Sequence, residues 1–198
     1  MEKNEIREKI KVLRQDQPAK LRAKRTKKIT YRTAELRELS IEQVRDKRIA
    51  IFHSFAGEPD MKELYDILTR RGAKLFFPVI CDSFLYMAEV DNGYDDPKTF
   101  HNGTLGIKEP DLVSDKFIPM DIIIIPGVAF SAQGDRIGFG KGYYDKYLAQ
   151  YGPNDLPVLI APIFEFQIIN EIFTDELDVP VDIIVTENEC IRTGIRHK

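Results

Sequence analysis

The sequence predicts a single α/β domain over residues 1–198, a Rossmann-like three-layer sandwich with a mostly parallel central sheet and helices on both faces. From residue 48 onward, short apolar runs typical of strands alternate with segments of helical periodicity. The run 121–126 is apolar on both faces, as expected of a central strand. A length of 198 residues suits one domain with a substantial core.

The N-terminal segment, about 2–28, is expected to form a basic amphipathic helix packed on the α/β body. Eleven of the 29 basic residues lie in this segment, and Ile6, Ile10 and Leu13 recur at helical spacing. Pro18 predicts a break. Such a face is usually solvated, and no aromatic side chains interleave with its charges as they would in an RNA-binding arm.

The remaining elements follow in chain order. A helix is expected over 59–71, because Met61, Leu64 and Leu68 share one face and Gly72 follows as a stop. A second helix is expected over about 141–150, and the polar segment 91–104 is expected to form turns. Strands are expected at 48–53, 75–80, 84–87, 121–126, 158–161 and 181–185.

Composition excludes several classes of protein. The chain is 43% apolar and 31% charged, as in soluble globular proteins, and its net charge of −3 does not favour a nucleic-acid partner. No apolar run reaches 18 residues, which argues against a membrane partner, and no signal peptide is visible at the N-terminus. The two cysteines, Cys81 and Cys190, suggest no disulfide framework, so we expect a cytoplasmic location.

The segment 137–145 carries the chemistry. Three glycines alternate with an aromatic residue and Lys141, and two tyrosines and Asp145 follow. Glycine lets backbone N–H groups approach a ligand, and successive N–H groups form a concavity for anions. Lys141 and Arg136 add positive charge for phosphate, and Asp145 offers the oxygen ligands that Mg²⁺ prefers. The pattern indicates a nucleotide-phosphate site with a metal.

Two familiar phosphate loops do not account for this segment. A Walker A loop needs its first glycine where Asp135 stands and a hydroxyl where Gly142 stands. The dinucleotide fingerprint needs a third glycine at Tyr143. A structural glycine-rich turn that leads into a helix, with the tyrosines in the core, stays an alternative.

The predicted topology places two loops at the same kind of sheet edge. In open α/β sheets, ligands bind beyond the carboxyl ends of the strands. The glycine-rich segment follows the predicted central strand, and His53 and the loop to Glu58 follow another strand at the same kind of edge. Glu109-Pro110 is explained by a strand-end turn and receives no role.

The segments 126–130 and 134–145 closely resemble the signature of the 5-formyltetrahydrofolate cyclo-ligase (methenyltetrahydrofolate synthetase) family. The resemblance extends over most of the chain and is strongest at 121–145. It implies a ligase that converts 5-formyltetrahydrofolate and ATP to 5,10-methenyltetrahydrofolate, ADP and phosphate with Mg²⁺. It also implies a monomer or weak homodimer that accepts folates with or without a polyglutamate tail.

The resemblance assigns site residues by position in this chain. Asp145 and Asp178 match magnesium ligands, and Lys141, Arg136 and Tyr143 are the residues expected to carry catalysis. The substrate set is His53, Glu58, Phe139, Gly140, Lys141, Gly142 and Tyr143. The ATP set is Lys3, Arg7, Arg136, Ile137, Gly138, Phe139, Gly140, Lys141, Gly142, Tyr143 and Tyr144.

Each assignment has a plainer alternative. Lys3 and Arg7 would otherwise be solvated charges, Glu58 a favourable charge before a helix, and Asp178 a turn residue. Alternatives for the whole protein are a non-catalytic folate- or nucleotide-binding relative, a phosphotransferase acting on another small molecule, and an RNA-binding protein. Phe139 and Lys141 also stand where many relatives have tyrosine and glycine, respectively.

Overall fold

The computed structural model describes residues 2–91, 93–103, 106–152, 154–170, 172 and 178–194. Its centre is a seven-stranded sheet in the order β11-β10-β9-β6-β1-β2-β3. The five inner strands are parallel, and β3 and β11 pair antiparallel at the two edges. The strands are β1 (Arg48–Ala50), β2 (Lys74–Cys81), β3 (Phe84–Glu89), β6 (Ile122–Ile124), β9 (Val158–Pro162), β10 (Ile183–Val185) and β11 (Cys190–Arg192).

The strand order confirms the mostly parallel sheet and the central position of β6. Numbered by their order in the chain, the parallel strands run 2-1-3-4-5 across the sheet. A dinucleotide-binding Rossmann sheet runs 3-2-1-4-5-6 instead, so the Rossmann-like part of the prediction is not confirmed. The order reverses between β1 and β6, and these two strands are direct neighbours.

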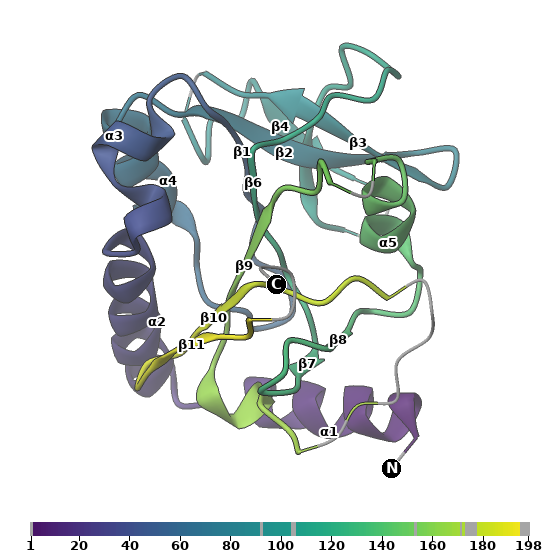
Figure 1. Ribbon diagram of the computed structural model, residues 1–198. Helices are drawn as coiled ribbons and strands as arrows, with labels where there is room; N and C mark the ends of the chain where they lie inside the picture. Colours follow the sequence, from purple (N-terminus) through teal and green to yellow (C-terminus); the bar gives the residue numbers. More distant parts are fainter. Residues whose placement is uncertain are drawn as a thin grey trace.

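Helices cover both faces of the sheet, as predicted (Figure 1). On one face, α2 (Ala19–Ala34), α3 (Ile41–Val44) and α4 (Lys62–Arg70) cover a core that includes Ile49 and Ile124. On the other face, α5 (Tyr143–Leu148) covers a core that includes Ala50 and Ile123. The alternation follows from strand geometry, because successive side chains point to opposite faces.

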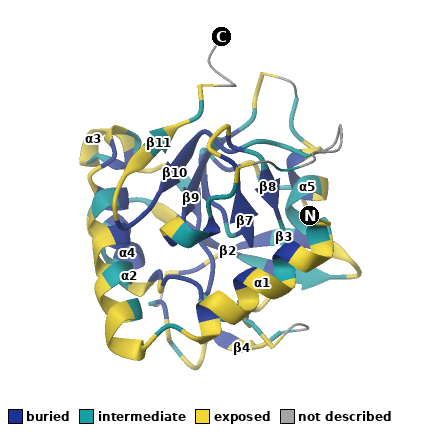
Figure 2. Cartoon of the chain, turned by 90° about the horizontal axis from the view of Figure 1, so that it is seen from below, coloured by how far each residue is buried: buried dark blue, intermediate teal, exposed yellow. Residues whose placement is uncertain are grey.

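Helix α1 (Lys3–Gln15) lies across one end of the sheet, beside β7 (Ala129–Phe130) and β8 (Arg136–Ile137) (Figures 1 and 2). Ile6 and Ile10 pack against Val128 and Ile137. The break at Pro18 is confirmed, and the second helix continues to Ala34 rather than ending near 28.

The predicted apolar face of α1 was wrong at one position. Leu13 is 38% exposed, whereas Arg14 is buried and continues the line of Ile6 and Ile10. Four-residue steps keep the same helix face, so Arg14 lies where periodicity alone would place an apolar side chain. Its guanidinium has polar partners inside the protein, the Gly127 carbonyl and the Glu58 carboxylate.

Several short elements were not predicted. β4 (Phe100–Asn102) lies in the segment expected to form turns, and it pairs with β5 (Lys108–Pro110) around Glu109. β7 and β8 form a separate two-stranded ribbon. These ladders are only two or three residues long, too short to produce a periodic pattern. Two 3-10 turns, η1 (Arg37–Leu39) and η2 (Glu165–Gln167), complete the elements, and none of the helices described here could span a membrane.

Candidate active site

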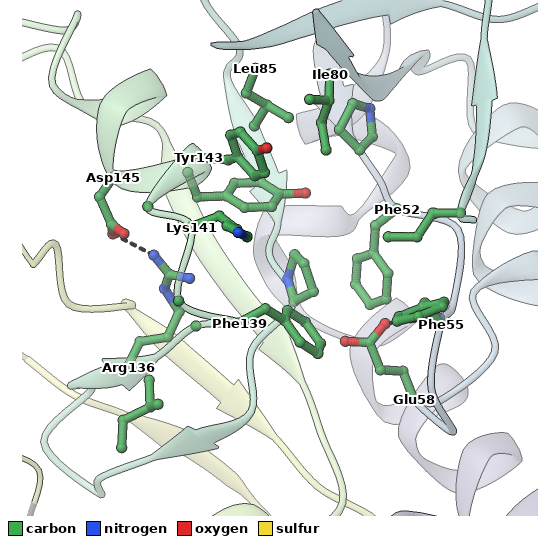
Figure 3. A pocket seen from close by; sticks show the side chains of 18 of the residues that line it. Phe52, Phe55, Glu58, Ile80, Leu85, Arg136, Phe139, Lys141, Tyr143 and Asp145 are labelled. Atoms are coloured by element: carbon green, nitrogen blue, oxygen red, sulfur yellow. Dashed lines mark hydrogen bonds and ion pairs between the residues drawn. The ribbon is translucent and has the colours of Figure 1, made fainter. Parts of the chain in front are cut away.

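A cavity of about 450 Å³ opens where the strand order reverses. The chain leaves β1 toward α4 on one face and leaves β6 toward α5 on the other. Diverging connections of this kind leave a crevice beyond the carboxyl ends of the strands. The loop from His53 to Glu58 lines one side, and Pro126 and the glycine loop (residues 136–145) line the other. Figure 3 shows the two sides facing each other.

The glycine loop is a strand-to-helix connection with two sharp turns. It begins in β8, which pairs with β7, and it ends in α5. Gly140 and Gly142 have φ values of +94° and +66°, in the left-handed region that glycine enters without a steric penalty. Every residue from Arg136 to Asp145 lines the cavity.

Helix α1 is docked on this loop by basic side chains. The Arg7 Nε donates a hydrogen bond to the carbonyl of Gly138 at 2.9 Å. A Cβ atom at Gly140 would lie 3.3 Å from the Arg7 guanidinium carbon, so glycine permits this close approach. Lys3, one turn earlier, forms an ion pair with Asp178 at 3.3 Å. Both basic residues line the cavity and can face an anionic ligand there.

The two predicted metal ligands lie in the same cavity. Asp145 of α5 accepts a 2.5 Å hydrogen bond from Arg136, and Asp178, before β10, pairs with Lys3. Within the described residues, no group of three or more acidic, His or Cys side chains could hold a metal alone. Mg²⁺ usually takes one or two carboxylates together with substrate phosphates. The donor set therefore fits a magnesium ion that arrives with a nucleotide.

Arg136 is suited to an anion as well. Its side chain is buried, and among the described residues its Nε makes no hydrogen bond. A buried donor without a partner is costly, so a ligand oxygen at this position would be favourable. Its guanidinium also lies over the Tyr144 ring, 5.9 Å from the centroid.

Glu58 supplies a buried carboxylate on the opposite side of the cavity. One oxygen accepts the N–H of Phe55 at 3.0 Å, while Oε1 makes no hydrogen bond to any described residue. Burial raises the pKa of Glu58 to about 7, although the nearby Arg14 guanidinium, 3.8 Å away, lowers it. The plainer interpretation of Glu58, a charge before a helix that favours the helix dipole, stays an alternative, although the side chain is buried.

His53 lies at the start of the same loop after β1, inside an aromatic cluster. Its ring lies 4.2 Å from that of Tyr94 and 4.5 Å from that of Phe100, centroid to centroid. Burial lowers the pKa of His53 to about 4, so the imidazole is neutral at physiological pH. In the described structure its Nε2 has no hydrogen-bond partner, which leaves one polar atom at the cavity wall.

Aromatic and aliphatic side chains complete the walls. Phe55 and Phe139 are 38% and 46% exposed and meet edge to face across the cavity, with centroids 6.5 Å apart. Figure 3 shows them beside Glu58, with Ile80 and Leu85 at the far end near Tyr143. Flat rings at an opening favour a planar ligand, because stacking buries both of its faces.

Sequence reasoning missed several lining residues, of which Glu109 is the most polar. It is buried in β5, and its carboxylate accepts the N–H of Ile80 at 3.3 Å. Gly103 packs against it so closely that a Cβ there would lie 2.2 Å from the carboxyl carbon. The turn assigned to Glu109 was therefore wrong, and only pairing between β4 and β5 reveals its place.

All of the residues proposed for nucleotide, substrate and metal line this one cavity. The sequence places them in four separate segments: α1, the loop after β1, the glycine loop and the residue before β10. Their convergence argues against the plainer interpretation of Lys3, Arg7 and Asp178 as unrelated surface charges. The individual roles stay predictions.

Comparison with known proteins identifies the family. The family model described as the 5-formyltetrahydrofolate cyclo-ligase family matches residues 1–187. The chain belongs to the 5-formyltetrahydrofolate cyclo-ligase family. The 5-formyltetrahydrofolate cyclo-ligase of Haemophilus influenzae is 29% identical over 92% of this chain and 97% of that protein. The Escherichia coli enzyme of the same name is 30% identical over 71% of this chain and 78% of that protein.

Solved structures agree with this membership of the cyclo-ligase family. The NMR structure of Aquifex aeolicus 5,10-methenyltetrahydrofolate synthetase superposes with a TM-score of 0.78 at 28% identity, covering 98% of this chain and 93% of that one. A 5,10-methenyltetrahydrofolate synthetase from Mycoplasma pneumoniae, at 23% identity and a TM-score of 0.69, shares the fold.

Proposed function

We propose that this protein converts 5-formyltetrahydrofolate and ATP to 5,10-methenyltetrahydrofolate, ADP and phosphate. Family membership supports the reaction. The main structural support for this reaction is one cavity, which is lined by the glycine loop, the basic residues of α1 and the buried Glu58. A phosphoryl donor and a planar acceptor can therefore lie side by side.

The ATP side is formed by the glycine loop and α1. Lys141, Arg136 and the loop N–H groups bind the triphosphate, and Lys3 and Arg7 close over it from the helix. In such transfers the protein mainly positions the phosphates and neutralises their charge. Asp145 and Asp178 would hold Mg²⁺ together with phosphate oxygens, and the bound ion would offset negative charge on the triphosphate.

The folate side is formed by the loop after β1. Within the described structure Oε1 of Glu58 accepts no hydrogen bond, so the ionised carboxylate suits the N–H donors of a pterin ring. His53 offers its Nε2, which no described residue contacts by a hydrogen bond, and Phe139 and Tyr143 flank the ring near its reactive end. The exposed rings of Phe55 and Phe139 supply the apolar contact.

The reaction proceeds in two steps. The γ-phosphoryl group moves from ATP to the formyl oxygen, which breaks the bond to the β-phosphate and releases ADP. N10 of the folate then attacks the formyl carbon, the carbon–oxygen bond breaks, and the oxygen leaves on phosphate with the N10 proton. No side-chain nucleophile is needed, since the protein holds both substrates in register.

We expect the enzyme to act in the cytoplasm as a monomer or weak homodimer, on folates with or without a polyglutamate tail. Neither nucleic acid nor a membrane is proposed as a partner, in line with the net charge of −3.

Acceptor-dependent ADP release tests this function against the alternatives. Purified protein with ATP and Mg²⁺ is mixed with 5-formyltetrahydrofolate, with 10-formyltetrahydrofolate, or with no acceptor. We expect ADP release only with the 5-formyl compound. Release with another small molecule alone would identify a different phosphotransferase, and folate binding with no release would identify a non-catalytic relative.

A further inference from the structure

Arg14 is a buried cation that the proposed mechanism does not use. It is 2% exposed, and its NH2 donates a hydrogen bond to the carbonyl of Gly127 at 2.5 Å. Its NH1 lies 3.8 Å from Oε1 of Glu58, and both side chains are almost completely buried. The guanidinium therefore bridges the backbone after β6 to the carboxylate after β1, and that carboxylate lines the cavity.

The backbone is arranged to admit this side chain. Gly57, next to Glu58, has a φ of +79°, and a Cβ there would lie 3.2 Å from the Cβ of Arg14. The Arg14 guanidinium also lies 5.9 Å from the centroid of the exposed Phe139 ring. These contacts fix Arg14 between the loop after β1 and the glycine loop.

The same helix face reaches the nucleotide side. Lys3, Arg7 and Arg14 are four and seven residues apart, so they lie along one face of α1. Lys3 pairs with Asp178, Arg7 bonds to Gly138, and Arg14 faces Glu58. One rigid element thus carries cations to both sides of the cavity.

Few other groups control the charge of Glu58. In the described part of the chain, the titratable side chains that interact electrostatically with Glu58 are Arg14 of α1 and Tyr144 of α5. Phe55 also donates its backbone N–H to Glu58. Lys141 and His53 line the same cavity without such a contact. Since burial favours the neutral acid, the cation of Arg14 is the main charge that favours the carboxylate.

We infer that Arg14 is a positioning residue for substrate binding: its guanidinium favours the ionised form of the Glu58 carboxylate and orients it toward the N–H donors of the pterin. Through Arg14, docking of α1 on the nucleotide side is tied to the folate side. This inference rests on the proposed function, because it takes Glu58 to be the pterin acceptor.

The test replaces Arg14 by methionine, which keeps an unbranched apolar chain and removes the charge. KM values for 5-formyltetrahydrofolate and for ATP are measured from about pH 6 to about pH 9, a range that spans titration of Glu58. We expect Arg14→Met to raise the folate KM about tenfold near neutral pH, as expected for loss of a charged partner. The loss should shrink at high pH, because Glu58 ionises there without help, while the ATP KM stays near the wild-type value.

Two controls separate charge from packing. Lys11→Met removes an exposed cation from the same helix and should leave both KM values and the pH profile unchanged. Arg14→Lys keeps the charge, so the acidic limb of its folate profile should stay near the wild-type position. A folded Arg14→Met enzyme with a wild-type limb, or with equal losses for ATP and folate, would overturn the inference.

If Arg14→Met does not fold, a second variant still tests the inference. The double variant Arg14→Met/Glu58→Gln removes both members of the buried ion pair, and its folate affinity is compared with that of Glu58→Gln. Equal affinities are expected if Arg14 acts through Glu58, whereas a further loss would contradict this. An inactive wild-type enzyme would reject the proposed function itself, and that result is read before any variant.

Discussion

At the scale of single residues, the charged side chains around the cavity differ in whether they have a partner of opposite charge. Asp145 and Asp178 each face a basic side chain, and Glu58 faces Arg14. Lys141 is different, because it is exposed and forms no ion pair within the described structure. Figure 3 shows its ammonium group projecting into the cavity. Its charge is therefore available to a ligand without breaking an internal contact.

Replacement of Lys141 by alanine should reduce activity and spare the fold. We expect kcat/KM to fall on the order of 100-fold, as for loss of one donor to a developing negative charge. The melting temperature should not change, because the side chain is exposed and forms no ion pair with the described residues. Lys146→Ala, an exposed lysine of α5, is the matched control. Unchanged turnover in a folded Lys141→Ala enzyme would remove Lys141 from the mechanism.

The residues that sequence could predict were those within one contiguous motif. The glycine loop was identified because its glycines, Lys141 and Asp145 are consecutive. Arg14 and Glu109 were missed because their partners, Glu58 and Ile80, are distant in the chain and no local pattern links them. Periodicity even favoured Leu13 over Arg14, since it counts apolar side chains and ignores buried ion pairs.

At the scale of elements, the close contact between α1 and the glycine loop positions the site. Arg7 passes so near Gly140 that only a residue without a side chain fits comfortably. The central strand β6, which is apolar on both faces, was predicted, and so was the break between α1 and α2 at Pro18. The ribbon of β7 and β8 was not, because two-residue ladders arise from tertiary pairing alone.

Gly140→Ala should weaken ATP binding through this contact. Alanine at a φ of +94° costs on the order of 1 kcal/mol of stability from backbone strain, and its Cβ would press on the Arg7 guanidinium. Gly93→Ala is the matched control, because its φ is +102° and no described residue beyond its chain neighbours lies within 4 Å of the added Cβ. We expect a similar stability loss in both, with a raised ATP KM only for Gly140→Ala. An unchanged ATP KM would refute the proposed docking role of α1.

At the scale of the whole molecule, two buried groups give the stability opposite dependences on pH. The pKa of Glu58 is raised to about 7 in the folded protein from an ordinary value of 4.5. The folded state therefore binds more protons, and stability falls as pH rises through this window. The pKa of His53 is lowered to about 4 from 6.5, so stability is lost as pH falls through that window.

Single replacements should reveal these opposing slopes. Relative to wild type, the free energy of unfolding of Glu58→Gln should rise with pH between about 4.5 and about 7, by at most about 1.4 kcal/mol per pH unit. His53→Phe should show the reverse trend between about 4 and about 6.5. Urea unfolding at a series of pH values measures both. Parallel curves for all three proteins would contradict the burial of these groups.

Sequence predicted the α/β class and the edge of the sheet that holds the site. It did not predict that β1 and β6 are neighbours, which places the loop after His53 opposite the glycine loop. Strand order depends on how the chain crosses over the sheet, and no local signal encodes it. The four segments that carry the proposed site residues could therefore be assigned to one site only through family resemblance.

The most direct test of the central claim is near-ultraviolet absorbance, because methenyltetrahydrofolate absorbs there and the 5-formyl compound does not. Purified protein is mixed with 5-formyltetrahydrofolate, Mg²⁺ and ATP, and a parallel sample omits ATP. We expect a rise that depends on ATP and is abolished or strongly slowed in Lys141→Ala. A folded protein that binds ATP and gives no rise would contradict the assignment of cyclo-ligase activity to this cavity.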